Sequence, residues 1–184
     1  MPTQVTAHSV SAKITMLEEN VSWCITGVYG PQTDPVKIAF MQEISDLKQH
    51  MMDQWLMLGD FNLIYRVEDK NNNRINIPML NRFKNTMDNL RLAPLELFGR
   101  RFTWCNDQQN PTMTKIDHFL AMAEWLEMFP RTDLQALASW VQTTAHSFYK
   151  EIRLSSSTEV SILRRIGSIC PTFWKRFIQH GSSR

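Results

Sequence analysis

Residues 55–64 of the chain read WLMLGDFNLI: four apolar residues run into a glycine, and two polar side chains follow. The apolar run predicts a strand that is covered on both of its sides. On an extended chain, positions two apart point to the same side, so we expect Asp60 and Asn62 side by side at the strand end and Phe61 in the core. The pair suits a site that needs an anionic oxygen and a neutral hydrogen-bonding group. Gly, Asp and Asn are also common turn residues, so an ordinary turn remains an alternative.

Strands and helices alternate on either side of this stretch, which is typical of an α/β sandwich. Apolar alternation or continuous apolar runs predict further strands at residues 8–17, 21–30, 100–106, 114–122 and 133–137. A helix is expected to begin where Asp34 caps it, with Pro35 at its first position. Helices are also expected over residues 79–92 and 123–129, and a polar loop at residues 68–78. The apolar faces of the first two helices are Val36, Phe40, Ile44 and Leu47, and Leu80, Phe83, Met87 and Leu90.

The composition is that of an ordinary globular domain. The chain has 184 residues, 43% of them hydrophobic and 21% charged, with a net charge of +2. Three well-separated cysteines (Cys24, Cys105 and Cys170) favour a reducing compartment. No apolar run is long enough to cross a bilayer, and the first residues lack the pattern of a secretion signal. We therefore expect an intracellular protein, cytoplasmic or nuclear, that has no membrane partner.

Five motifs occur in a specific order: GVYGP (27–31), LMLGDFNLI (56–64), EDKNN (68–72), GRRFTWCND (99–107) and KIDHFL (115–120). Together they resemble the endonuclease/exonuclease/phosphatase superfamily, and more closely the endonuclease domain of plant LINE-type (non-LTR) retrotransposons. The resemblance covers roughly residues 8–137. It implies an incomplete two-sheet α/β sandwich of the DNase I-like type with flanking helices. It also implies Mg²⁺-assisted cleavage of a DNA phosphodiester, with no small-molecule cofactor.

The resemblance assigns roles to four residues of this chain. Asp60 matches the carboxylate that orients and deprotonates the attacking water, and it is the expected metal ligand. Asn62 matches a residue whose amide contacts the phosphate region. Tyr29 matches a phenol that hydrogen-bonds the phosphate, and Asp117 matches the carboxylate that holds the catalytic histidine.

Other parts of the family pattern do not occur in the sequence. The family opens with a strand that bears an Asn and a strand that ends in Gln-Glu, and it closes with Ser-Asp-His. We expect this chain to be truncated before its first residue, to bind Mg²⁺ weakly and to be catalytically impaired. His118 is expected to face away from the site because it neighbours Asp117 on a strand. His146 lies near the expected position of the catalytic histidine, but its neighbours match nothing in the family.

The family pattern stops after about residue 137. Each residue fixes the first two bases of its codon, and residues 141–149 (VQTTAHSFY) are compatible with SDHCPLLL when the frame is shifted by one base. Residues 166–174 (IGSICPTFW) are compatible with WEHLPDFLE in the same way. We therefore expect a partial domain over residues 1–137 and an out-of-frame tail, poorly packed or loosely helical, over residues 138–184. The alternative is that the free third bases produce a coincidental match.

Four functions are compatible with the sequence. The first is a pseudoenzyme, the remnant of a retrotransposon endonuclease. The second is an active Mg²⁺-dependent nuclease that obtains its missing groups elsewhere. The third is a non-catalytic remnant that binds nucleic acid through the loop KNNNR (70–74) and the basic tail. The fourth is a phosphoesterase from the phosphatase branch of the superfamily, which EDKNN and FTW disfavour.

Overall fold

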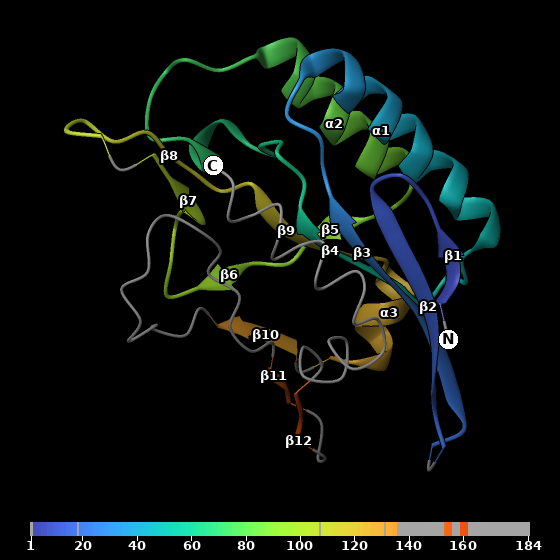
Figure 1. Cartoon of the computed structure of the whole chain (residues 1–184). Coiled ribbons are helices and arrows are strands. Elements are labelled where there is room, and N and C mark those ends of the chain that lie inside the picture. Colours follow the sequence, from blue (N-terminus) through green and yellow to red (C-terminus); the bar gives the residue numbers. More distant parts are fainter. Residues whose placement is uncertain are drawn as a thin grey trace.

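The described part of the computed structural model comprises residues 2–17, 19–106, 108–130, 132–135, 153–155 and 159–161. These residues form a pair of helices, a six-stranded sheet and a smaller, four-stranded sheet, with the large sheet between the other two layers (Figure 1). The layers confirm the two-sheet α/β architecture that the sequence predicts. No described helix is long and apolar enough to cross a membrane.

The large sheet is built around the quoted stretch of sequence. Its strands, in spatial order, are β1 (Pro2–Val5), β2 (Ser9–Met16), β3 (Val21–Tyr29), β4 (Trp55–Asp60), β9 (Asp117–Ala121) and β5 (Ala93–Pro94). β3 pairs with β2 in antiparallel and with β4 in parallel orientation, and β9 runs antiparallel to β4. Trp55 and Met57 pack on the helix side of β4, whereas Leu56 and Leu58 belong to the cluster on the other side. The continuous apolar run of β4 is thus explained by burial on both faces.

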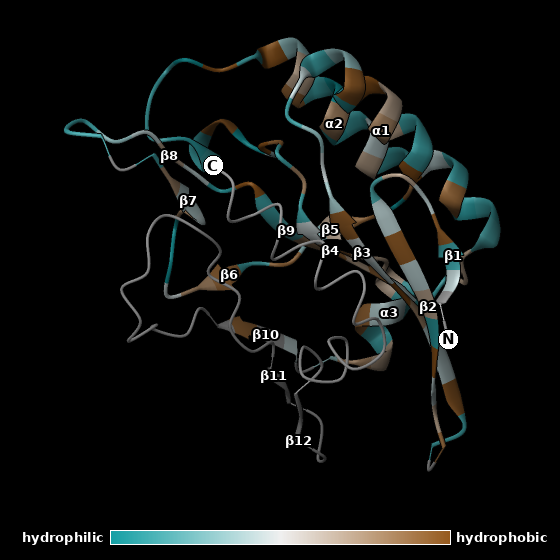
Figure 2. Ribbon diagram, in the orientation of Figure 1, coloured by the Kyte–Doolittle hydropathy of each residue, from teal (hydrophilic) through white to brown (hydrophobic). Residues whose placement is uncertain are grey.

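Two helices that run side by side in the same direction cover one face of the large sheet: α1 (Asp34–Leu47) and α2 (Ile77–Asn89) (Figure 1). Both alternate between hydrophobic and hydrophilic segments, as amphipathic helices do (Figure 2). Thr33, and not Asp34, is the N-cap of α1, because Asp34 already has helical geometry. The predicted apolar face of α1 is correct except for Val36, which is 41% exposed; Met41 is buried in addition.

The opposite face of the large sheet is covered by α3 (Ala123–Met128) and the small sheet. Its strands, in spatial order, are β12 (Glu159–Ser161), β11 (Arg153–Ser155), β10 (Thr132–Gln135) and β6 (Leu97–Phe98). Three aromatic rings pack together between these layers. The ring centroid of Trp125 lies 5.8 Å from that of Trp23 and 4.8 Å from that of Phe129. The buried apolar residues therefore form two clusters, one on each face of the large sheet.

Several predicted strands and one predicted loop have different bounds in the structure. The expected strand over residues 100–106 is reduced to β7 (Trp104–Cys105), which pairs with β8 (Met113–Thr114). The expected strand over residues 114–122 is divided between β8 and β9. The expected polar loop at residues 68–78 contains the end of a 3₁₀ turn, η2 (Val67–Asp69), and the first residues of α2. Of the predicted tail, β11 and β12 are described, and the rest lies outside the described residues.

Glu43 on α1 ties the helix layer to the turn between β1 and β2. Its carboxylate accepts hydrogen bonds from the Thr6 hydroxyl and from the backbone N–H of His8 (3.1 Å), and it pairs with His8 Nδ1 (2.9 Å). Both partners are largely shielded, since the side chains of His8 and Glu43 are 23% and 17% exposed. The edge of the large sheet is thereby fixed to α1.

Replacing Glu43 by alanine is expected to lower the free energy of unfolding by about 1–3 kcal/mol, because three partly buried donors lose their acceptor. Urea denaturation measures the effect. Asp46→Ala is the matched control, since Asp46 is exposed on the same helix and should change stability by at most about 0.5 kcal/mol. Equal midpoints for the two variants would contradict the assigned role of Glu43.

Candidate active site

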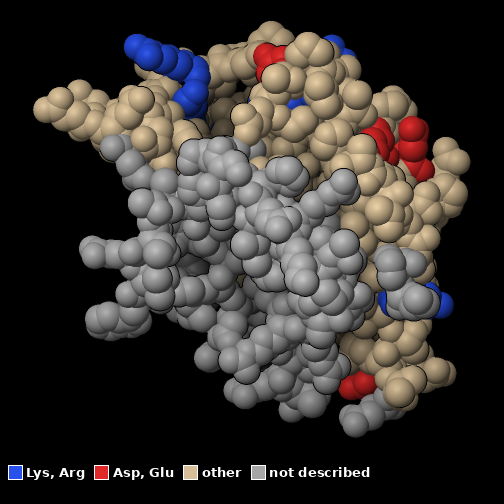
Figure 3. All heavy atoms as spheres, in the orientation of Figure 1, with Lys and Arg blue, Asp and Glu red and all other residues tan. Residues whose placement is uncertain are grey.

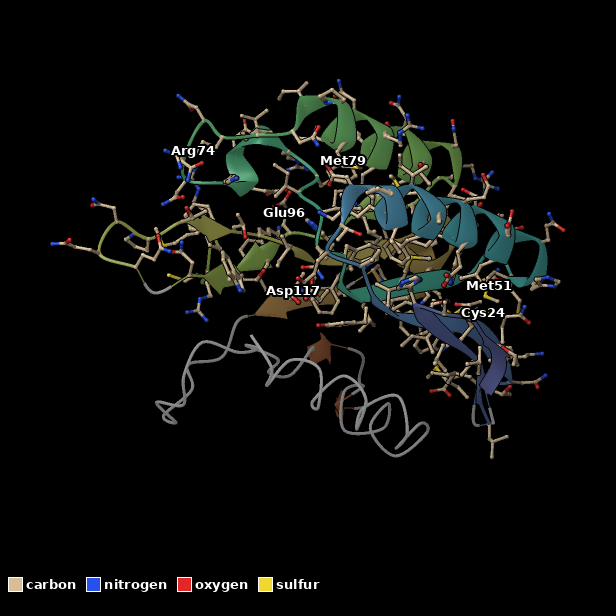
Figure 4. All side chains as sticks on the ribbon, turned by 45° about the horizontal axis from the view of Figure 1, so that its top comes forward. Cys24, Met51, Arg74, Met79, Glu96 and Asp117 are labelled. Atoms are coloured by element: carbon tan, nitrogen blue, oxygen red, sulfur yellow. The ribbon has the colours of Figure 1, made fainter. Side chains whose placement is uncertain are left out.

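Three strand ends bring Tyr29, Asp60 and Asp117 into one row. Tyr29 on β3 is the register partner of Asp60 on β4, and Asp60 is the register partner of Asp117 on β9. Register partners on neighbouring strands share a face of the sheet and lie close together. All three residues are half-buried, and Asp117 is labelled in Figure 4. A phenol and two carboxylates from distant parts of the chain thus meet at one edge of the large sheet.

Alternation along the strands determines the face on which this row lies. Val28 and His118, which precede Tyr29 and follow Asp117, are both buried, and Val28 packs in the cluster beneath the helices. Tyr29 and Asp117 must therefore point to the opposite face, toward the small sheet. The row lies between the layers at the open ends of the strands.

Asn62 lies near this row, but the chain between Asp60 and Asn62 is not an extended strand. β4 ends at Asp60, and Asn62 has φ = 52°, in the left-handed region. The expectation that the chain stays extended from Asp60 to Asn62 is therefore wrong, although the two residues are in contact. The backbone N–H of Asn62 donates to Asp60 Oδ1 (2.8 Å), and its side-chain Nδ2 donates to the Gly30 carbonyl (2.6 Å). Phe61 is fully buried, as the sequence predicts.

Two glycines allow the ends of β3 and β4 to approach closely. A Cβ on Gly30 would lie 2.1 Å from the Phe61 carbonyl oxygen, and a Cβ on Gly59 would lie 2.1 Å from that of Val28. Gly59 also has φ = 141°, a conformation that L side chains rarely adopt. The Gly30 N–H donates to the Asp60 carbonyl over 2.6 Å. The two glycines are visible in the sequence within VYGP and LGD, but the roles follow only from the close approach of the two strand ends.

His118 supports the site from the helix side. It is 2% exposed, its Nε2 lies 2.8 Å from the Leu63 carbonyl oxygen, and its ring contacts those of Phe61 and Phe83. Burial lowers the pKa of its imidazole to about 4, against the smaller opposing effect of the hydrogen bond to Leu63. His118 therefore faces away from the row, as expected. It ties β9 to the segment that follows Asp60.

The EDKNN motif has a structural role through Asp69. This buried carboxylate accepts hydrogen bonds from the backbone N–H groups of Tyr65 (2.9 Å) and Arg66 (2.8 Å). The Tyr65 hydroxyl in turn donates to Asp88 on α2 (3.0 Å). Burial, followed by the hydrogen bond to Asp88, raises the pKa of the Tyr65 phenol to about 12. These contacts fix the path of the chain between β4 and α2.

The asparagines that follow Asp69 connect this loop to the β7–β8 hairpin. Asn71 donates through Nδ2 to the Pro111 carbonyl (2.8 Å) and accepts through Oδ1 from the Met113 N–H (3.0 Å). Asn72 donates to the Thr112 hydroxyl (3.1 Å). Lys and Arg side chains gather at this end of the molecule, and Arg74 is labelled there (Figures 3 and 4). The loop therefore carries positive charge on a backbone that these hydrogen bonds hold in place.

Asp60 and Asp117 are the residues of the row that could hold a metal ion. Mg²⁺ is usually bound by one or two carboxylates together with substrate phosphate oxygens, so two opposed carboxylates are a suitable but minimal set. Within the described ranges, no three His, Cys, Asp or Glu side chains form a group that could hold a metal by themselves. A bound ion would thus depend on the substrate for part of its coordination.

The fold is DNase I-like. The chain is similar to the endonuclease domain of TRAS1, a telomere-specific non-LTR retrotransposon, with a TM-score of 0.54 and 14% identity over 65% of this chain and 52% of that one. It is also similar to the catalytic domain of Xenopus laevis APE2, with a TM-score of 0.44 and 20% identity over 65% and 46% of the two chains. The match thus spans about half the length of each of these structures. No protein-family model and no curated protein sequence matches the chain.

Proposed function

We propose that this chain is the remnant of a Mg²⁺-dependent DNA endonuclease of retrotransposon origin, of the plant LINE type, that acts inside the cell and is catalytically impaired. The observation that carries the proposal is the row of Tyr29, Asp60 and Asp117 at the strand ends of a DNase I-like sheet. The non-LTR retrotransposon endonuclease of the same fold supports it. DNA is the proposed partner.

Asp60 is the proposed group that orients the attacking water and accepts its proton. A carboxylate is a weak base, so its orientation must contribute much of the effect. The Asn62 N–H fixes one of its oxygens at 2.8 Å. Tyr29, beside Asp60 in the row, is the proposed donor to a phosphate oxygen. Mg²⁺, when bound by Asp60 and Asp117, would supply positive charge against the charge that develops on the phosphoryl oxygens.

The proposed impairment rests on motifs that the sequence does not contain. It has no Ser-Asp-His, and its only Gln-Glu pair is Gln42–Glu43, which lies on helix α1. Glu43 is bonded there to Thr6 and His8, on the helix side of the sheet. Loss of one electrostatic contact to a transition state commonly costs about 10²–10³ in rate. Two losses need not multiply, because residues that act as a unit are not additive.

The first test is nicking of supercoiled plasmid with Mg²⁺ or Mn²⁺. The purified chain is expected to nick DNA near the background rate. Asp60→Asn should not lower this rate further, and Asp53→Asn, a change at an exposed aspartate, is the matched control. Rapid nicking that Asp60→Asn abolishes and Asp53→Asn preserves would overturn the impairment and establish an active nuclease.

A second test asks whether the row faces DNA at all, and it does not depend on cleavage. Without metal, the Asp60 carboxylate repels a phosphate placed at the row, so Asp60→Asn should tighten duplex binding by about threefold to tenfold. Fluorescence anisotropy in the presence of EDTA measures this change. The Asp53→Asn control should bind like the unmodified chain. Equal affinities for all three proteins would contradict a DNA site at the row.

The basic loop at residues 70–74, which hydrogen bonds hold to the β7–β8 hairpin, favours a second candidate function, non-catalytic binding of nucleic acid. Arg74 is exposed on this loop, and Asn71 and Asn72 hold the loop to the β7–β8 hairpin. In this case Arg74→Ala should weaken DNA binding and lower its dependence on salt concentration, whereas Asp60→Asn should leave the affinity unchanged. The same anisotropy measurements separate this function from the first.

A further inference from the structure

Both backbone polar groups of Gly30 are bonded to the turn that carries Asp60. The Gly30 N–H donates to the Asp60 carbonyl (2.6 Å), and the Gly30 carbonyl accepts from Asn62 Nδ2 (2.6 Å). Gly30 directly follows Tyr29, the last residue of β3. We name this pair of bonds the Gly30 clasp. Its first bond belongs to the last ladder pair, Tyr29 and Asp60, and its second bond extends the contact between the ends of β3 and β4 beyond that pair.

Asn62 has a backbone conformation that suits the clasp. Its φ of 52° directs its side chain back across the turn, and Asn tolerates the left-handed region better than most residues. Its N–H donates to Asp60 Oδ1, so one residue bonds the carboxylate through its backbone and β3 through its side chain. The neighbouring Phe61 N–H donates to the Ile116 carbonyl (2.9 Å), which fixes the turn on the β9 side as well.

We propose that Asn62 is a positioning residue that acts through Asp60 and Tyr29: its side chain holds the clasp closed, and the closed clasp sets the orientation of the Asp60 carboxylate. The inference rests on the function proposed for Asp60, and it deepens that function. The family resemblance implies that the Asn62 amide contacts the phosphate region of the substrate. In this structure an N–H of that amide is directed to the Gly30 carbonyl.

The physical reason is the sensitivity of such chemistry to geometry. A carboxylate on a strand end can rotate about its side-chain torsions, and a displacement of about 1 Å at a reacting centre can cost on the order of a hundredfold in rate. A hydrogen bond from a fixed backbone N–H removes this freedom. That N–H is fixed only while the turn keeps the left-handed conformation at residue 62.

Matched variants separate the clasp from backbone strain. Asn20, in the turn between β2 and β3, has φ = 53°, almost the value of Asn62. Asn62→Gly and Asn20→Gly both allow the left-handed conformation, whereas Asn62→Ala and Asn20→Ala both strain it. Any effect seen at residue 62 and not at residue 20 therefore belongs to the side-chain contact and not to the conformation.

The readout is NMR of the full chain, without DNA or metal. In the unmodified protein, three-bond scalar couplings should show a single χ1 rotamer for Asp60, because the residue 62 N–H donates to its carboxylate. Asn62→Gly is expected to mix the Asp60 rotamers and to speed hydrogen exchange of the Gly30 amide by about tenfold or more. Neither Asn20 variant should change either signal.

The outcomes are decisive in both directions. An unchanged Asp60 rotamer and unchanged Gly30 exchange in both Asn62 variants would overturn the inference, and so would equal changes in the Asn20 variants. Because these signals need no cleavage, they are independent of the nicking and DNA-binding tests of the proposed function. If nicking is measurable, Asn62→Gly should lower kcat by about tenfold or more with little change in KM, as expected for lost orientation.

Discussion

Replacement of Gly59 by alanine is expected to cost about 4 kcal/mol or more of stability, which places it among the most damaging single substitutions. The new Cβ would lie 2.1 Å from the Val28 carbonyl oxygen and 3.0 Å from the Val28 carbonyl carbon and nitrogen. These are backbone atoms of the neighbouring strand, so no side chain can rotate away to make room. The φ of 141° at Gly59 adds strain, because alanine disfavours this region.

Gly99→Ala is the matched control for this substitution. Gly99 also has a positive φ, of 84°, but it lies at an exposed position. Its replacement should cost only the conformational strain, about 1–2 kcal/mol. Urea denaturation, followed by circular dichroism, compares the two variants with the unmodified chain. If Gly59→Ala unfolds at the same urea concentration as Gly99→Ala, the close approach of β3 and β4 is not a constraint on the fold.

Acidification is expected to destabilise the protein through His118. Its pKa in the folded state is about 4, below the usual histidine pKa of 6.5, so the unfolded chain binds a proton between these pH values and the folded protein does not. Stability from this group is therefore fully present above about pH 6.5 and is lost as the pH falls toward 4. The difference between the two pKa values corresponds to about 3 kcal/mol.

His118→Gln tests this assignment. The Gln side chain can donate to the Leu63 carbonyl as His118 does, and it does not titrate. Between about pH 6.5 and 4, the free energy of unfolding should fall more steeply with acid for the unmodified protein than for the variant. His50→Gln, a change at an exposed histidine, should keep the full slope. An identical slope for the His118→Gln protein would show that another group is responsible for the acid sensitivity.

The parts of the fold that the sequence predicts best are those with a long, regular pattern. β2, β3, β4 and the two long helices have alternation, a continuous apolar run or helical periodicity that local burial explains. β5, β6, β7 and β8 have only two residues each, and each exists because a partner strand lies beside it. Short strands of this kind depend on tertiary pairing, which a local pattern does not contain.

The candidate site was predictable to a similar degree. Tyr29, Asp60 and Asp117 were found through motifs, and the register of the sheet places them together. The conformation of Asn62 was not predictable from alternation, because it depends on Gly30, which is distant in sequence. His118 was expected to face away from the site, but its bond to the Leu63 carbonyl follows from the tertiary structure alone.

The row has a consequence for the order of events while the chain is being synthesised. Tyr29 and Asp60 are about 30 residues apart and Asp60 and Asp117 almost 60, and pairings across such separations form slowly because a long loop must close first. β3 and β4 can pair as soon as both have left the ribosome, but the second carboxylate arrives only with β9. A nascent chain that stops before β9 therefore exposes one side of β4, an unpaired and strongly apolar strand. The site and the protection of this strand from aggregation are thus completed in the same step.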